Sequence, residues 1–156
     1  MSTGSGIVVD ETLAPLVVVT YPRGVTTDED VHVYIEWLHR RLREERHFVQ
    51  LIETRNMETP VSAAQRRLIA ASLEHPLYRD LRRYKLGDAV VMHSVLVRGA
   101  FGAMPANAKI VSPIEIFDRA VDTVTFLGAH LSSVGLDLTD AMRTRIHAVD
   151  VAFAAR

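Results

Sequence analysis

The chain has 156 residues, of which 48% are hydrophobic, and its 18 basic and 19 acidic side chains give a net charge of −1. This length and composition predict one globular domain, and the even charge argues against a general nucleic-acid-binding protein, which usually has a basic surface. The absence of cysteine excludes disulfides, thiolate metal sites and cysteine nucleophiles, and it fits a reducing cytoplasm.

The first six residues are small and polar, and we expect residues 1–6 to be a disordered tail. They do not combine a basic segment with an apolar run, so the sequence predicts no secretory signal. No apolar run approaches the ~20 residues that a membrane-spanning helix needs. We therefore expect a cytoplasmic protein without a membrane span.

Short runs of β-branched residues alternate with helical stretches along the chain. Two runs, at residues 7–9 and 16–21, are separated by a loop and predict a β-hairpin. Thr27 precedes three acidic residues and predicts a helix start, because carboxylates favour the positive end of the helix dipole. That helix should run to about residue 45. Its apolar residues recur at helical spacing and form its core face: Val31, Tyr34, Ile35, Leu38 and Leu42.

The next strand is predicted at residues 47–54, and a second helix follows it. Ser62 and Gln65 match a capping box, in which the two side chains satisfy free backbone N–H groups at the helix start. Pro76 falls inside the helical pattern, so this helix should kink or break near His75.

The second half of the chain continues the alternation. Ser112 and Pro113 mark an edge or a bulge in the last strand, and Asp118 is expected to cap the helix that follows. Gly99 and Gly102 allow a neighbouring element to approach closely. The predicted elements are a strand at 88–92, a short helix at 95–104, a strand at 108–117, and helices at 118–134 and 138–155.

This order of elements predicts an α/β domain with a mixed sheet of about five strands and with helices on one side of it. A further helix is added at the C-terminus. We divide the chain into the tail at 1–6, the α/β domain at 7–134 and a helical extension at 135–156.

The order of elements and three segments resemble the STAS family, the fold of bacterial anti-sigma-factor antagonists. The segments are PLVVVTYPRGVTTDEDV at 15–31, PVSAAQRR at 60–67 and DAVVMHSVLVRGAF at 88–101. They are similar to small uncharacterised bacterial proteins with a STAS-like fold, and the resemblance covers residues 7–134. It implies a non-catalytic regulatory or interaction module with a bacterial regulatory protein as partner.

The resemblance also implies a modification site. In antagonists of this family, a phosphorylatable serine caps the second helix after an Asp-Ser-Ser-Gly-like stretch. That stretch is absent from the loop at residues 56–62 here, and Ser62 matches by its place at the helix start. Ser62 or the nearby Thr59 is therefore the expected phosphate acceptor.

Three motifs were weighed for catalysis or metal binding. His32, Glu36 and His39 share a helix face and have side chains that bind zinc, but their spacing differs from the metalloprotease motif. We prefer a solvated polar face. His93 and Ser94 lack the nucleophile-elbow context of serine hydrolases, and both common phosphate-binding glycine loops are absent. We expect no enzyme, no cofactor and no metal site.

A basic segment is a candidate binding surface. Between residues 66 and 85, six basic side chains stand against two acidic ones. This excess indicates a patch for an anion or an acidic partner, or an ordinary solvated helix face. The basic residues are Arg66, Arg67, Arg79, Arg82, Arg83 and Lys85.

Two apolar surfaces are candidate interfaces. Val33 and Trp37 share a helix face outside the core stripe, and tryptophan is enriched at the centres of interfaces. The last helix has one apolar stripe and must dock somewhere: it covers Trp37 in its own chain, or it pairs with a second chain. Because cyclic dimers commonly bury such surfaces, we expect a homodimer. The stripe consists of Leu138, Met142, Ile146, Val149 and Phe153.

The first functional hypothesis is a non-catalytic protein-interaction or signalling module of STAS type that associates with itself. The alternative is a carrier for a small apolar ligand, held in a pocket between the helices and the sheet. An enzyme is the third and least favoured interpretation.

Overall fold

Five strands form one mixed sheet in the computed structural model, which describes residues 6–93 and 112–156. They lie side by side in chain order: β1 (Val8–Asp10), β2 (Leu16–Thr20), β3 (Phe48–Glu53), β4 (Lys85–Val91) and β5 (Ile114–Phe117). β1 is antiparallel to β2, and the later neighbours are all parallel. Because parallel neighbours need a crossover connection, helices separate β2 from β3 and β3 from β4. The predicted α/β fold with a mixed sheet is confirmed.

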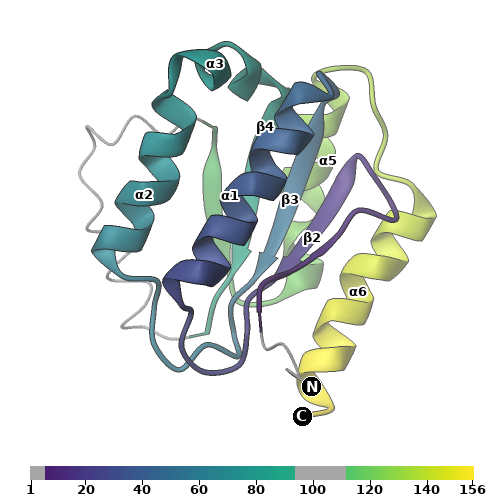
Figure 1. The fold of residues 1–156 in the computed structure, drawn as a ribbon. Coiled ribbons are helices and arrows are strands. Elements are labelled where there is room, and N and C mark those ends of the chain that lie inside the picture. Colours follow the sequence, from purple (N-terminus) through teal and green to yellow (C-terminus); the bar gives the residue numbers. More distant parts are fainter. Residues whose placement is uncertain (1–5, 94–111) are drawn as a thin grey trace.

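The described helices cover both faces of the sheet. In Figure 1, α1 and α2 lie in front of the sheet and α5 lies behind it, and α6 packs into the same core as α5. The expectation of helices on one side is therefore wrong. The helices are α1 (Asp28–Arg43), α2 (Ala63–Glu74), α3 (Pro76–Arg79), α5 (Val124–Ser132) and α6 (Asp140–Ala154), with single turns η1 (Leu81–Tyr84) and η2 (Ala120–Thr123).

The sequence of β2 explains why both faces need cover. Its first four residues are all buried, and they alternate between the two cores: Leu16 and Val18 face α5 and α6, whereas Val17 and Val19 face α1 and α2. A continuous apolar run in a parallel strand has no side that tolerates water. Helices on one face alone would leave half of this strand exposed.

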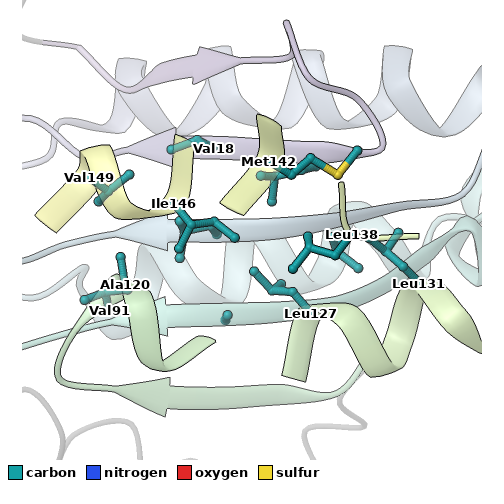
Figure 2. Close-up of a cluster of buried hydrophobic side chains, with 13 residues drawn as sticks. Val18, Val91, Ala120, Leu127, Leu131, Leu138, Met142, Ile146 and Val149 are labelled. Atoms are coloured by element: carbon teal, nitrogen blue, oxygen red, sulfur yellow. The ribbon is translucent and has the colours of Figure 1, made fainter. Parts of the chain in front are cut away.

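The apolar stripe of α6 is buried inside its own chain. Met142, Ile146 and Val149 are at most 6% exposed, and Figure 2 shows them in one cluster with Val18 of β2 and Leu127 of α5. Burial of this stripe stabilises the fold by roughly 1.5–3 kcal/mol for each large apolar side chain. The helical extension at 135–156 is thus part of the same core.

Ion pairs of Arg55 hold the C-terminal half of α6 against the sheet, and we call this group the ionic clamp. The Arg55 side chain is 3% exposed, and its guanidinium donates to Glu53 at the end of β3 and to Asp150 of α6, at 2.9 Å for the Asp150 pair. It also lies 4.2 Å from the ring centroid of Phe153. Both carboxylates are thereby compensated, as buried charges must be.

The starts of the helices follow local rules. The predicted capping box of Ser62 and Gln65 forms at α2, and the predicted helix start at Thr27 is a capping box with Asp30. The predicted break also holds, because α2 ends at Glu74 and α3 begins with a proline. The two capping boxes satisfy backbone N–H groups that would otherwise be unpaired.

The cap predicted at Asp118 is wrong. The segment begins with the turn η2, and the N–H groups of Ala120 and Val121 donate to the Asp150 carboxylate at 2.8 and 2.9 Å. The capping group therefore comes from α6, far along the chain. Other predicted features lie outside the described residues: Ser94, the helix at 95–104 with Gly99 and Gly102, and the strand residues 108–111.

Candidate functional site

A cluster of polar side chains is buried on the face of the sheet that α1 and α2 cover. Gln50 of β3 and Asp88 of β4 occupy paired positions on neighbouring strands and are 0% and 5% exposed. The Tyr34 hydroxyl of α1 donates to Gln50 Oε1 at 2.9 Å. Lys85 Nζ donates to Asp88 Oδ2 and, at 2.8 Å, to Ser112 Oγ. These contacts connect two strands, one helix and the segment just before β5.

Two atoms of this cluster have no hydrogen-bond partner among residues 6–93 and 112–156. They are Asp88 Oδ1, an acceptor, and Gln50 Nε2, a donor. Buried polar atoms in folded proteins are bonded in the large majority of cases, and an unpaired one costs about 1–3 kcal/mol. The pair of neighbouring side chains therefore has unused capacity both to accept and to donate a hydrogen bond.

Asp88 also lines a cavity of about 90 Å³. Its polar lining is Tyr21, Thr54 and Asp88, and its apolar lining is Ile52, Met57, Pro60, Val61, Val90, Met92 and Ile114. Tyr21 and Thr54 directly follow the carboxyl ends of β2 and β3. Ligand sites of open α/β sheets lie at that edge. We call this cavity the Asp88 pocket.

The ionisation of the tyrosines limits the chemistry of this site. Burial raises the pKa of the Tyr21 hydroxyl well above its usual range, and the charge of Asp88 adds to the effect. The pKa of Tyr34 is raised for the same two reasons, burial first. Both hydroxyls therefore remain protonated near neutral pH and act as neutral hydrogen-bonding groups.

Ser112 and Lys85 resemble a serine–lysine pair, but their geometry does not support nucleophilic catalysis. Lys85 Nζ donates to Asp88 as well as to Ser112, so its protons are already directed at two acceptors. Ser112 is 4% exposed and out of reach of a large substrate. A nucleophile needs a base that accepts its proton, and in this contact lysine is the donor.

The predicted basic patch does not form as one surface. Lys85 is buried in β4 beside Asp88. Arg66 donates to the Val61 carbonyl at 2.6 Å, and Arg82 pairs with Glu74 at 2.8 Å. The members that remain exposed are Arg67, Arg79 and Arg83.

Ser62 and Thr59 are both exposed at the entrance to α2. The Ser62 hydroxyl accepts from the Gln65 N–H at 3.1 Å, and Gln65 Nε2 donates to the Thr26 carbonyl at 3.0 Å, so the cap also connects α2 to the start of α1. Val61, which precedes the cap, lines the Asp88 pocket. Phosphorylation of either residue stays a prediction.

The histidines of α1 have separate structural roles. His32 Nδ1 lies 2.7 Å from the Asp28 carbonyl. His39 stacks on Tyr78 with ring centroids 3.7 Å apart, and burial lowers its pKa. In residues 6–93 and 112–156, no three His, Asp or Glu side chains are arranged to hold a metal ion. His93 contacts the Phe153 ring edge-on at 5.1 Å.

The predicted interfaces are largely covered within the chain. Trp37 is 8% exposed and packs between Tyr34 and Phe48, and the α6 stripe is on the opposite face of the sheet. The predictions that α6 covers Trp37, or offers its buried stripe to a second chain, are therefore wrong. Phe153 is half-buried under Arg55, and Val33 remains 51% exposed.

The residues of the polar cluster were missed at the sequence level. Their signal was the presence of Gln50 and Asp88 inside apolar strands, where polar side chains are rare.

No protein-family model matches the chain, and no curated protein or solved structure matches it significantly. Within the part of the chain that the structure describes, no helix is long and apolar enough to span a membrane.

Proposed function

We propose that this chain is a non-catalytic binding module that holds one end of a small, mainly apolar molecule in the Asp88 pocket. The main support is that Asp88 lines an apolar cavity and that its buried Oδ1 has no hydrogen-bond partner among the described residues. A hydroxyl or amine of the ligand would satisfy this acceptor, and its hydrocarbon part would gain by burial against the apolar lining.

The size of the pocket restricts the ligand. A cavity of 150 Å³ in another protein holds benzene, and the Asp88 pocket measures about 90 Å³. Only a short aliphatic group with its polar end fits this space. The rest of a larger molecule would extend beyond the pocket.

The test compares two isomers, 1-butanol and methyl propyl ether, which differ in the presence of a hydroxyl donor. Titrations of the full chain are followed through the methyl NMR signals of Val61, Val90 and Met92. The alcohol is expected to bind about tenfold more tightly, which corresponds to one buried hydrogen bond. Equal affinity of the two isomers, or no change at these methyl groups, contradicts the proposal.

Variants locate the interaction at Asp88. Asp88→Asn replaces the charged acceptor by a weaker amide oxygen and should reduce the preference for the alcohol. Asp122→Asn, at an exposed carboxylate paired with Arg119, should not change it. Because Asp88→Asn also weakens the contact with Lys85, Val61→Leu is the second variant. It leaves the ion pair intact, fills the pocket and should weaken binding of both isomers.

A protein partner is the second candidate, favoured by the outer face of α1. Val33, Trp37, Arg43 and Tyr78 help to line a shallow groove of about 500 Å³. This groove, and not the α6 stripe, is the surface left for the predicted homodimer. Light scattering of Val33→Glu beside the wild type tests it: a dimer should dissociate, and a monomeric wild type contradicts self-association.

The wider assignments are part of the same proposal. Membership of the STAS-like group is supported by the β-β-α-β-α-β order of the elements up to β4, and a cytoplasmic bacterial protein with a regulatory partner follows from that resemblance. The module is expected to show no turnover of generic ester, phosphate or peptide substrates. A robust activity that disappears on His93→Ala would contradict a non-catalytic role.

A further inference from the structure

A second cavity, of about 230 Å³, lies at the opposite edge of the sheet, where β2 and β3 begin. Three segments surround it: the loop before β2, the end of α1 with the residues after it, and the loop between α5 and α6. Its basic wall is Arg41, Arg46 and His47, and its apolar wall is Ala14, Pro15, Val134 and Leu136. In the part of the chain that the structure describes, no acidic side chain lines it.

Arg41 is the buried member of the basic wall, at 5% exposure. Its Nη1 donates to Glu44 at 2.6 Å, and its guanidinium lies 5.4 Å from the ring centroid of Phe48. Its Nε is buried and has no hydrogen-bond partner among the residues that the structure describes. A guanidinium has five N–H donors, and Arg41, which lines the cavity, has one donor that no described residue uses.

The nearby acids neutralise this wall only in part. Glu44 is shared between Arg41 and Arg40, and Glu11 pairs with Arg40 at 2.8 Å. Arg46 is exposed and makes no ion pair with the described residues. Basic residues in the last turn of a helix complement its dipole, which accounts for Arg40 and Arg43. Arg46 lies beyond the helix end, so this effect does not explain it.

From this arrangement we infer that the cavity binds a small organic carboxylate with an apolar body. The planar guanidinium of Arg41 matches the geometry of a carboxylate, and Arg46 adds a second positive charge at the mouth. The apolar wall would cover the hydrocarbon part of the ligand. The site is independent of the Asp88 pocket, because the two cavities have no lining residue in common.

The experiment uses three probes with the full chain: octanoate, 1-octanol and inorganic phosphate. Octanoate alone combines the charge with the apolar chain, so it should bind at least about tenfold more tightly than either other probe. No saturable binding of octanoate, or equal binding of octanol or of phosphate, overturns the inference.

Two variants assign the binding to the basic wall. Arg41→Lys keeps the charge but removes the Nε donor and should raise the Kd for octanoate about tenfold. Arg46→Gln changes an exposed residue without a risk to folding and should raise it about threefold. Arg67→Gln, an exposed arginine of α2, is the matched control. An Arg46→Gln variant that behaves like Arg67→Gln overturns the inference, whatever the stability of Arg41→Lys.

Discussion

The two faces of the sheet differ in what the same strands place on them. Towards α5 and α6, the central positions of the strands are apolar: Leu16, Val18, Val49, Leu51, Ala89 and Val91. Polar side chains reach this face at strand ends, where Asp10 pairs with Arg145 of α6 and Glu53 pairs with Arg55. Towards α1 and α2, the neighbouring positions on β3 and β4 are Gln50 and Asp88, with Lys85 and Tyr34 around them. One face therefore has an apolar centre with ion pairs at the ends of its strands, and the other has a buried polar cluster at its centre.

This difference suggests a division between stability and binding. A parallel sheet covered by helices is normally apolar on both faces, and a buried ion pair is often no more stabilising than apolar residues of similar volume. The polar cluster therefore needs a reason other than stability. Departures from local rules of this kind are expected at functional sites.

The largest effect is expected at the ion pair. Asp88→Ala leaves the Lys85 ammonium buried and unpaired and should lower the free energy of unfolding by about 3–5 kcal/mol. The double variant Lys85→Met with Asp88→Leu should recover this loss, or exceed the wild type by about 1–4 kcal/mol, and lose alcohol binding. Urea denaturation measures both. If the double variant is as unstable as the single one, the cluster is structural, and the division between the faces is wrong.

The opposite face should behave as a plain core. Ile146 of α6 is 0% exposed, so Ile146→Ala should cost about 2–5 kcal/mol through the cavity it leaves. It should not change binding of butanol to the remaining folded protein. Val151 of the same helix is 55% exposed, and Val151→Ala is the control, with an expected change within about 0.5 kcal/mol. Similar losses for the two variants would show that α6 is not docked through its stripe.

Local features of the sequence predicted local structure well. The helix start at Thr27, the capping box at Ser62 and the helix break at Pro76 depend on residues a few positions apart, and each was confirmed. The continuous apolar run of β2 also indicates that helices cover both faces of the sheet, whereas the order of elements alone predicts helices on one side.

The polar cluster required knowledge of the register. Gln50 and Asp88 become neighbours only when β3 and β4 pair, and Arg55 meets Asp150 only when α6 docks. Short-range patterns contain no information on either contact. The unusual residue types are visible in the sequence, but the residues that they contact in the folded chain are not.

Acid should weaken the clamp that holds α6 on the apolar face. Burial alone would raise the pKa of Asp150, but the N–H groups of Ala120 and Val121 and the Arg55 guanidinium lower it below its usual 3.8. A depressed pKa gives stability that is present above the unfolded value and is lost as pH falls through the folded value. Asp150→Asn should therefore unfold with a shallower pH dependence below about pH 4. The exposed Asp137→Asn variant should keep the wild-type slope, and an unchanged slope in Asp150→Asn would contradict this role.

The smallest effect is expected at the Ser62 N-cap of α2, one of the helices that cover the polar cluster. Ser62→Ala removes the acceptor for the Gln65 N–H and should cost about 1 kcal/mol, measured by thermal or urea unfolding. Ser62→Asp keeps an acceptor at the same position and should stay close to the wild type, because aspartate is an equally good N-cap residue. The residue before the cap, Val61, lines the Asp88 pocket, so loosening the cap should also weaken ligand binding in Ser62→Ala but not in Ser62→Asp. Equal stability of all three proteins would mean that the first turn of α2 is held by the tertiary bonds of Gln65 to Thr26 and Asp28 rather than by its cap.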